Sequence, residues 1–440
     1  METVRMLPAV VKRMKDAARA VKGKTVQVIH AVKEVTLSHL LDLPHFLVES
    51  YGVEEDAEQD ILHLYCRLTV EVAVCPLCET LTSAVKEHKK RCIRDLDLFD
   101  KRTFVHFQIR RFECAECGHR FTEELQAVGW RRHQTLRFEQ AVYQQCLQNS
   151  KKAVAEQFHL SQCTVYGIFK RWAKRMQKGQ RLDGCVRILG MDEIALKKRH
   201  KQYALVLSDL ERRCVIAVLP SREQAEIKHW FDTLSQEQRD AIRVVSMDMW
   251  RPYRSFVERY LPQARIVADR FHVMKQLNDQ LTKARRQIQR HADADTKAAL
   301  KGSRWLLVRT RSSLTEEQET QLQQVLAAQT ELRVAYLLKE EFWLIFERIH
   351  DREQARRFLQ AWMLKVLYTN NRYLTAFCDT LRNWFDQILN YFDKRITNGF
   401  VEGMNRAIRT LIAFAYGFRN FDNFKLQIIA QHGPPVEYTI

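Results

Sequence analysis

The sequence lacks a long apolar run. Among its 440 residues, no segment approaches the ~20 consecutive apolar residues that a membrane-spanning helix requires. The first residues, METVRMLPAVVKRMKDAARAVKGK, carry scattered lysines and arginines where a signal peptide has an apolar block. The eleven cysteines also lack a disulfide-like rhythm, apart from two Cys-x-x-Cys pairs, which favours a reducing compartment. We therefore expect a soluble, folded, cytoplasmic protein with no membrane partner.

The sequence has fewer acidic than basic residues. The chain has 71 Lys and Arg against 53 Asp and Glu, a net charge of +18 and a pI near 9.5. An excess of positive charge of this size indicates a polyanionic partner, with DNA or RNA as the first candidate. The alternative is a basic protein without a nucleic-acid partner, which can have the same composition. With 46% apolar residues, a chain of this length predicts two to four domains.

Two cysteine pairs have the spacing of metal-binding knuckles. CPLC contains Cys75 and Cys78, and CAEC contains Cys114 and Cys117, so each pair can turn both thiolates toward one tetrahedral Zn²⁺. The alternating segment RTFVHFQIRRFEC would return the second pair to the first. The pattern predicts a structural zinc ribbon, because four protein ligands leave no open position for catalysis. The alternatives are free thiols in a small core, or substitute ligands from His88, Cys92 or His119.

A helix, a short break and a second helix follow. KKAVAEQFHLSQCTVYGIFKRWAKRM breaks at HLS, and Ser161 opens the second helix. The expected internal core is Val154, Phe158, Leu160, Val165 and Ile168. A DNA-reading helix-turn-helix places the start of its second helix in the major groove, whereas a generic helical hairpin would show the same periodicity. The expected DNA contacts are Gln162, Thr164, Tyr166, Lys170 and Arg171.

Five strand-like runs come next: VRILGMDEIAL, QYALVLSDL, RCVIAVLPS, AIRVVSMDM and ARIVADRF. Helix-like segments separate the third run from the fourth and the fourth from the fifth, so the order is βββαβα followed by β. This order predicts an RNase H-like α/β layer in which the first and fourth strands are parallel neighbours. From His272 to about Phe392 the periodicity is helical.

Two aspartates end strands that should be neighbours. Asp192 is expected at the end of the first strand and Asp248 at the end of the fourth, so both would project at one edge of the sheet. Close carboxylates repel each other, and a hard cation such as Mg²⁺, which prefers oxygen ligands, relieves that repulsion. Glu193 would point to the opposite face, because adjacent strand residues alternate. Singly, each aspartate could be a turn former or a cap; together they predict a divalent metal site.

A third carboxylate lies in TNGFVEGMNRAIR. Glu402 is flanked by Gly399 and Gly403, although each glycine costs about 1 kcal/mol in a helix interior. It would complete a two-metal site that acts on a phosphodiester. Asp269 and His272 in ADRFHV would share one side of a helical turn near the same edge. The alternatives are a capping aspartate with a packed histidine, and a solvated helix with chance glycines.

These motifs together resemble bacterial insertion-sequence transposases of the DDE type, specifically the ISL-three family. The resemblance is carried from about Leu41 to Ile429 by CPLC, RRFECAECGHRFTE, the helix-turn-helix, GMDEIALKK, VVSMDMWRPYRSFVERYLPQARIVADRFHVMKQLN and TNGFVEGMNRAIRTLIAFAYGFRNFDNF. It implies an RNase H-like catalytic domain, interrupted by an α-helical insertion, that cuts transposon ends and joins them to target DNA. The implied cofactors are two Mg²⁺ ions, with Mn²⁺ as a substitute, and structural Zn²⁺. The implied catalytic, magnesium-binding triad is Asp192, Asp248 and Glu402, with accessory roles for Asp269, His272, Asn405 and Arg406.

The resemblance also implies partners and a domain order. The ribbon and helix-turn-helix would recognise terminal inverted repeats in double-stranded DNA, in a cytoplasmic, nucleoid-associated protein. Synapsis of two ends requires a homodimer or larger assembly. The main alternative is a catalytically silent DNA-binding regulator, which loss of a triad carboxylate would signal. The expected domains are a basic arm (1–40), the zinc-ribbon module (41–130), the helix-turn-helix (131–180), the first part of the catalytic core (181–290), the helical insertion (291–392) and the C-terminal catalytic helix (393–440).

Overall fold

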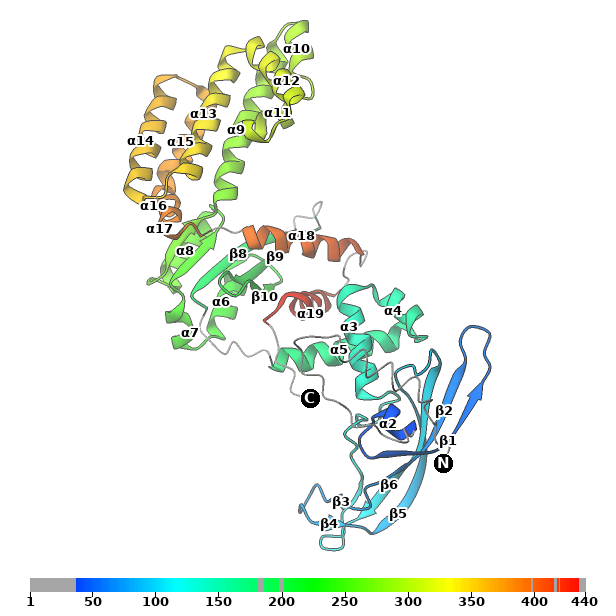
Figure 1. The fold of residues 1–440 in the computed structure, drawn as a ribbon. Coiled ribbons are helices and arrows are strands. Elements are labelled where there is room, and N and C mark those ends of the chain that lie inside the picture. Colours follow the sequence, from blue (N-terminus) through cyan, green and yellow to red (C-terminus); the bar gives the residue numbers. More distant parts are fainter. Residues whose placement is uncertain are drawn as a thin grey trace, which may run out of the picture. The chain divides into compact units, whose positions relative to one another are not determined.

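The computed structural model describes residues 37–179, 186–197, 202–396, 399–414, 418 and 420–434. The chain divides into two compact units, with the boundary between Trp172 and Ala173 (Figure 1). Most of the basic arm expected over residues 1–40 lies outside the described residues. Within the described part of the chain, no helix combines the length and the apolar content needed to cross a bilayer.

The first unit contains a sheet that is buried on one face. Its strands run in the order β1-β2-β6-β5, with β7 paired to β6, and a separate hairpin pairs β3 with β4. Alternation along β2 and β6 turns Leu64, Val105 and Phe107 into the core and His63 and His106 to the other face. The elements are α2 (Leu37–Leu41), β1 (Phe46–Glu54), β2 (Ile61–Leu68), β3 (Ala73–Val74), β4 (Leu81–Thr82), β5 (Val85–Arg94), β6 (Arg102–Glu113) and β7 (Arg120–Thr122).

The predicted helix–break–helix pattern is confirmed. Three helices follow, α3 (Leu136–Gln148), α4 (Lys151–Gln157) and α5 (Gln162–Gly179), and the boundary between the two units falls within α5. Ser161 caps α5 as expected, because its Oγ accepts a hydrogen bond from the backbone N–H of Thr164 at 3.1 Å. The expected core residues Val154, Val165 and Ile168 are buried, and Phe158 and Leu160 are partly buried.

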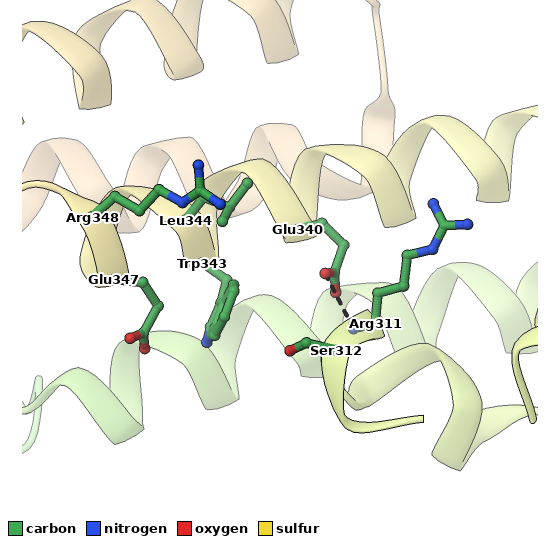
Figure 2. A pocket seen from close by; sticks show the side chains of 7 residues that line it. All are labelled: Arg311, Ser312, Glu340, Trp343, Leu344, Glu347 and Arg348. Atoms are coloured by element: carbon green, nitrogen blue, oxygen red, sulfur yellow. Dashed lines mark hydrogen bonds between the residues drawn. The ribbon is translucent and has the colours of Figure 1, made fainter. Parts of the chain in front are cut away.

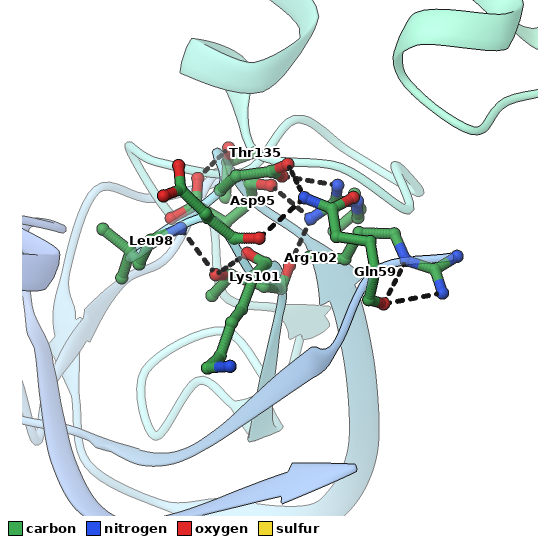
Figure 3. Close-up of polar contacts among 10 residues, drawn as sticks. Gln59, Asp95, Leu98, Lys101, Arg102 and Thr135 are labelled. Carbon is green, nitrogen blue, oxygen red and sulfur yellow. Dashed lines mark hydrogen bonds and ion pairs between the residues drawn. The ribbon is translucent and has the colours of Figure 1, made fainter. Parts of the chain in front are cut away.

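A buried carboxylate, that of Asp95, links the sheet to α3 through hydrogen bonds (Figure 3). Asp95 is fully buried just after β5, and its Oδ1 accepts hydrogen bonds from Thr135 Oγ1 at 2.6 Å and from Arg137 Nε at 2.9 Å. Thr135 also caps α3 by accepting from the N–H of Phe138. Because an unpaired buried charge is costly, this network makes the sheet and the helix-turn-helix interdependent.

The second unit is built on a mixed sheet in the order β10-β9-β8-β11-β12. The pairs β8–β9 and β9–β10 are antiparallel, whereas β8–β11 and β11–β12 are parallel. The predicted order βββαβα followed by β is confirmed, with one refinement: the helical segment before β11 is two helices, because Ser235 starts the second with a capping box. The elements are β8 (Ile188–Lys197), β9 (Gln202–Asp209), β10 (Cys214–Leu219), α6 (Gln224–Asp232), α7 (Gln236–Ala241), β11 (Val244–Met247), α8 (Arg251–Tyr260) and β12 (Arg265–Ala268).

A helical block follows over residues 270–394, as the periodicity predicted, and Figure 1 shows its long helices side by side. Phe342, Trp362 and Phe377 are fully buried at its centre, with ring centroids of Phe342 and Trp362 4.8 Å apart. The helices are α9 (Arg270–His291), α10 (Ala294–Leu300), α11 (Arg304–Val308), the 3-10 turn η2 (Arg311–Ser313), α12 (Glu316–Ala328), α13 (Thr330–Arg348), α14 (Arg352–Tyr368), α15 (Arg372–Asn383), α16 (Phe385–Leu389) and α17 (Tyr391–Lys394).

The chain then returns to the sheet through α18 (Gly399–Phe414) and α19 (Phe421–His432). These helices cover the sheet face that carries Ile194 and Val206, where Met404 and Phe424 join the same apolar cluster. The opposite face, which carries Leu189, Leu205 and Leu207, packs against α6 and α8. The sheet is therefore covered on both faces, and alternate residues of β8 meet different helices.

Candidate functional site: an acidic centre, a zinc knuckle pair and a DNA-reading helix

The parallel pairing of β8 with β11 brings two aspartates together. Met191 lies opposite Met247, so the next residues, Asp192 and Asp248, leave this ladder side by side. Ligand atoms of Asp192, Asp248 and His272 all lie within 4.8 Å of one another. One expectation was wrong: Asp192 does not end its strand, because β8 continues to Lys197 through antiparallel pairing with β9, and only the pairing with β11 stops at Met191.

The neighbouring glutamate is turned away, as alternation along the strand predicted. Glu193 forms an ion pair with Arg222 at 3.1 Å and accepts a hydrogen bond from the hydroxyl of Tyr253 at 2.9 Å. Burial and the charge of Glu193 raise the pKa of that tyrosine, which keeps it a neutral donor. Glu193 therefore belongs to the α8 side of the sheet, and Asp192 to the α18 side.

A histidine links Asp248 to a third aspartate. His272 Nδ1 lies 2.7 Å from Asp248 Oδ1 and 2.9 Å from Asp269 Oδ2. Asp269 also caps α9 by accepting from the N–H of Phe271 at 3.4 Å, so it is both a cap and a member of this cluster. Burial alone would lower the pKa of His272, but its hydrogen bonds and the charges of the two aspartates raise it to about 10. His272 is therefore a cation at neutral pH.

A residue from a distant part of the chain, Asn405, forms a hydrogen bond with Asp192. Asn405 on α18 is buried, and its Nδ2 donates to Asp192 Oδ2 at 2.5 Å. Burial, followed by the charge of Asp248, raises the pKa of Asp192 to about 7. A Cβ at Gly190 would come within 3.3 Å of Val401 and 2.8 Å of Leu210, so glycine gives α18 room to approach β8. Gly190 was not singled out from the sequence, although a glycine inside a strand was the available signal.

Glu402 lies on the same helix, one turn before Asn405, and it is exposed. Its carboxylate is not among the groups whose ligand atoms lie within 4.8 Å of one another in the described residues. Arg406 is also exposed, and a Cβ at Gly403 would meet open space, so no described protein atom requires that glycine. The role expected for Glu402 remains a prediction.

The donor set of this centre fits a hard divalent cation. Asp192 and Asp248 offer carboxylate oxygens, which Mg²⁺ prefers. Asn405 Oδ1 beside them is buried without a hydrogen-bond partner among the described residues, and an unpaired amide oxygen is an acceptor that a metal-bound water can use. The pKa of Asp192 is raised because burial and the charge of Asp248 outweigh the opposing charge of His272.

The four paired cysteines converge as predicted. The Sγ atom of Cys78 lies 3.4 Å from the Sγ of Cys114 and 3.5 Å from the Sγ of Cys117. The Sγ atoms of Cys75 and Cys117 are 3.7 Å apart. Tetrahedral Zn–S bonds of about 2.3 Å place sulfurs roughly 3.8 Å apart, so the residues fit structural Zn²⁺. The substitute ligands considered, His88, Cys92 and His119, are not part of this group.

The two cysteine knuckles share one backbone design. Gly118 has φ 69° and donates its N–H to the carbonyl of Cys114, which closes a tight turn after CAEC that suits glycine. Glu79 occupies the matching place after CPLC, with φ 59° and an N–H donated to the carbonyl of Cys75. This second turn was not predicted, because a glutamate gives no signal for a left-handed conformation.

The predicted DNA-contacting residues lie along α5. Gln162 and Lys170 are exposed, and Thr164 and Tyr166 are partly exposed near the start of the helix. Arg171 differs: its guanidinium forms an ion pair with the buried carboxylate of Glu139 on α3, which also accepts from the indole N–H of Trp172 at 3.1 Å. The charge of Arg171 is therefore engaged in packing α5 against α3.

A separate pocket lies in the helical block (Figure 2), lined by Arg311, Ser312, Glu340, Trp343, Leu344, Glu347 and Arg348. Its carboxylates already have partners, because Glu340 accepts from the N–H of Arg311 at 3.2 Å and Glu347 pairs with Arg270. No residue of the acidic centre lines it. The pocket adds no further group to the chemistry described above.

Comparison with known proteins finds a family model over each of the three regions that carry these residues. Residues 189–428 match a family model described as transposase, residues 123–173 match the helix-turn-helix domain of transposase family ISL3, and residues 71–117 match the zinc-finger of transposase IS204/IS1001/IS1096/IS1165. The transposase for insertion sequence element IS1001 of Bordetella parapertussis is 30% identical over 87% of this chain and 95% of its own length. The transposase for insertion sequence element IS1557 of Mycobacterium tuberculosis is 26% identical over 85% of this chain and 89% of its own length. With its zinc ribbon, helix-turn-helix and paired aspartates, the chain belongs to the ISL3 family of DDE transposases.

Proposed function

We propose that this transposase binds the terminal inverted repeats of its insertion sequence and catalyses Mg²⁺-dependent strand cleavage and transfer into target DNA. The observation that carries the proposal is the placement of Asp192 beside Asp248 on parallel strands, with Asn405 of α18 bonded to Asp192. The strand order β10-β9-β8-β11-β12 supports an RNase H-like core. The helical block between β12 and α18 supports the expected insertion, and the six domain ranges given above remain our proposed division of the chain.

The proposed catalytic triad is Asp192, Asp248 and Glu402. Two Mg²⁺ ions held there, or Mn²⁺ in their place, would supply charge stabilisation for the attacking and leaving oxygens of a phosphodiester. Glu402 is on the helix that already contacts Asp192, and its exposure leaves it accessible to a DNA backbone. Arg406, exposed one turn beyond Glu402, is placed to pair with phosphate.

The accessory residues position the carboxylates. His272, charged at neutral pH, holds Asp248 and Asp269 at hydrogen-bond distance from one nitrogen. Asn405 donates a hydrogen bond to Asp192 Oδ2, and the backbone N–H of Glu193 donates one to Oδ1 at 2.7 Å, so both oxygens of that carboxylate are oriented. These contacts hold three acidic groups close together, which reduces the reorganisation that ligand binding requires.

DNA recognition is assigned to the first unit. Gln162, Thr164, Tyr166 and Lys170 are proposed to read or position the terminal repeats, and the zinc ribbon to stabilise the sheet beside them. Arg171 contributes through its ion pair with Glu139, which fixes α5 on α3. A homodimer or larger assembly follows from the need to hold two ends at once.

The test uses a labelled duplex that carries the inverted repeat flanking the gene. Wild-type protein should release the cleaved strand only with Mg²⁺ or Mn²⁺, and Asp192→Asn, Asp248→Asn and Glu402→Gln should each lose cleavage by at least about a thousandfold while still binding the duplex. The matched control is Asp422→Asn, an exposed carboxylate on α19 of the same sheet face. Unchanged cleavage in Glu402→Gln would remove that residue from the triad. Binding without cleavage by the wild-type protein would favour the alternative, a catalytically silent DNA-binding regulator.

A further inference from the structure

The face of the first-unit sheet that is turned away from its core carries a cluster of rings. His63 and Tyr65 on β2 lie opposite Phe104 and His106 on β6 in the parallel register. Tyr65 stacks on His106 with centroids 4.8 Å apart and planes 24° apart, and His63 stacks on Phe104 at 5.9 Å and 24°. The rings of His63 and His106 are 5.1 Å apart, so the four side chains, which we call the ring platform, form one continuous surface.

The ring platform is accessible, although its neighbours on the other face are buried. Tyr65 is 46% exposed in the middle of a strand whose alternate residues, Leu64 and Cys66, are buried. Packing between neighbours holds the rings in place: His63 Nδ1 lies 2.8 Å from His106 Nε2, and Glu54 pairs with His63 Nε2 at 3.2 Å. Burial, and then the neighbouring His63, lower the pKa of His106, which keeps that ring neutral at pH 7. An ordered ring surface is suited to stacking.

Cations flank the ring platform on the same face. Cys92 lies opposite His106 on β5, with its Sγ 3.8 Å from His106 Nε2, so the residues two and four positions before it, Lys90 and His88, share that face. Both are exposed, and Lys90 has no ion-pair partner in the described part of the chain. On β2, Arg67 follows Tyr65 by two positions; its side chain is 56% exposed, and its Nε lies 3.3 Å from the exposed carboxylate of Glu49. Exposed rings between exposed cations complement unpaired bases on a phosphate backbone.

We propose that the ring platform, flanked by Lys90 and Arg67, binds single-stranded DNA by stacking unpaired bases on Tyr65. The proposal rests on the proposed function, because strand cleavage and transfer generate unpaired DNA next to the bound ends. It adds a second, sequence-tolerant DNA contact to the groove-reading helix α5. Duplex DNA is a poorer fit, since its base faces are already stacked and cannot reach an aromatic ring.

The experiment measures binding of a labelled single strand of about 16 nucleotides by fluorescence anisotropy, at a salt concentration of about 0.3 M that suppresses non-specific phosphate contacts. Full-length, zinc-loaded protein is used without Mg²⁺. Tyr65→Ala should weaken single-strand binding at least about fivefold and Tyr65→Phe less than about twofold, because stacking needs the ring and not the hydroxyl. Binding of the terminal-repeat duplex should stay within about twofold in both variants.

The chain offers a matched control for this measurement. Tyr51 on β1 is 47% exposed, nearly the same as Tyr65, but it lies opposite Leu64 and so belongs to the other face of the sheet. Tyr51→Ala should leave single-strand binding unchanged. Equal losses in Tyr51→Ala and Tyr65→Ala would overturn the proposal, as would equal losses of single-strand and duplex binding in Tyr65→Ala.

Two further outcomes concern the ring platform and the acidic centre separately. If the full-length protein does not bind the single strand, the proposal is overturned. If Tyr65→Ala loses single-strand binding while the wild-type protein fails to cleave its terminal repeat, the platform stands and the proposed catalytic function falls. Circular dichroism and zinc content, which should match the wild type, verify that each variant is folded.

Discussion

Replacement of Asp192 by asparagine should stabilise the zinc-loaded protein in the absence of Mg²⁺, and more so at higher pH. The folded-state pKa of Asp192 is raised to about 7, from its ordinary value of 3.8, chiefly by burial and then by Asp248. Between these two values the folded protein holds a proton that the unfolded chain releases, so wild-type stability falls as pH rises and is constant above about 7. Asparagine is neutral throughout, and its amide oxygen can still accept the hydrogen bond from Asn405.

The size of this stability difference follows from the shift in the pKa of Asp192. At about 1.36 kcal/mol per pKa unit, the stability advantage of Asp192→Asn should grow by up to about 3 kcal/mol between about pH 5 and about pH 8. Thermal unfolding at the two pH values measures it, with about 2 to 4 °C expected per kcal/mol for a domain of this size. The bound zinc is common to both proteins and cancels in the difference. Asp379→Asn, which removes an exposed carboxylate on α15, should show no pH-dependent gain.

Addition of Mg²⁺ completes this test. Millimolar Mg²⁺ should raise the thermal-unfolding midpoint of the wild-type protein, because a ligand that binds only the folded state stabilises it. The unfolding midpoint of Asp192→Asn should not change. A stability difference between the two proteins that is the same at both pH values would refute the link between the burial of Asp192 and its raised pKa. Destabilisation of the Mg²⁺-free protein by asparagine near pH 8 would refute it equally.

Three other substitutions test the first unit. Cys114→Ser should reduce bound zinc from about one to nearly zero per chain by elemental analysis, whereas Cys92→Ser, outside the cluster, should retain it. Lys170→Ala should weaken duplex binding about equally for all sequences and reduce the slope of log affinity against log salt by about 1, and an unchanged slope would exclude a phosphate contact. Asp95→Ala should destabilise the unit by about 3 to 5 kcal/mol in urea unfolding, because Arg137 loses its buried partner; a loss below about 1 kcal/mol would contradict the linking role of this network.

Local patterns predicted much of this molecule. Strand alternation predicted β6, the Cys-x-x-Cys spacing predicted the thiolate cluster, and the order of strands predicted that Asp192 and Asp248 would be neighbours. Each of these rests on chain geometry over a few residues or on a rule for connecting strands. The continuation of β8 past Asp192 escaped prediction because it depends on the partner strand β9.

Contacts between distant segments were beyond the reach of such patterns. The inward turn of Arg171 depends on Glu139, which lies 32 positions earlier on another helix. The single nitrogen of His272 that faces both Asp248 and Asp269 depends on how α9 leaves β12. Neither arrangement has a sequence period, so only the folded structure distinguishes a functional side chain from a packed one.

The hydrogen bond between Asn405 and Asp192 joins residues 213 positions apart, and this sets an order of events during synthesis. The unit that carries the helix-turn-helix ends at Trp172 and is made first. At about 5 to 20 residues per second, a ribosome needs on the order of 10 to 40 s to travel from Asp192 to Asn405. Throughout that interval the nascent chain has its DNA-reading helices but an unfinished acidic centre. A product truncated within the helical block would lack α18 and Asn405 permanently. It would bind DNA through its helix-turn-helix but could not complete the acidic centre on β8.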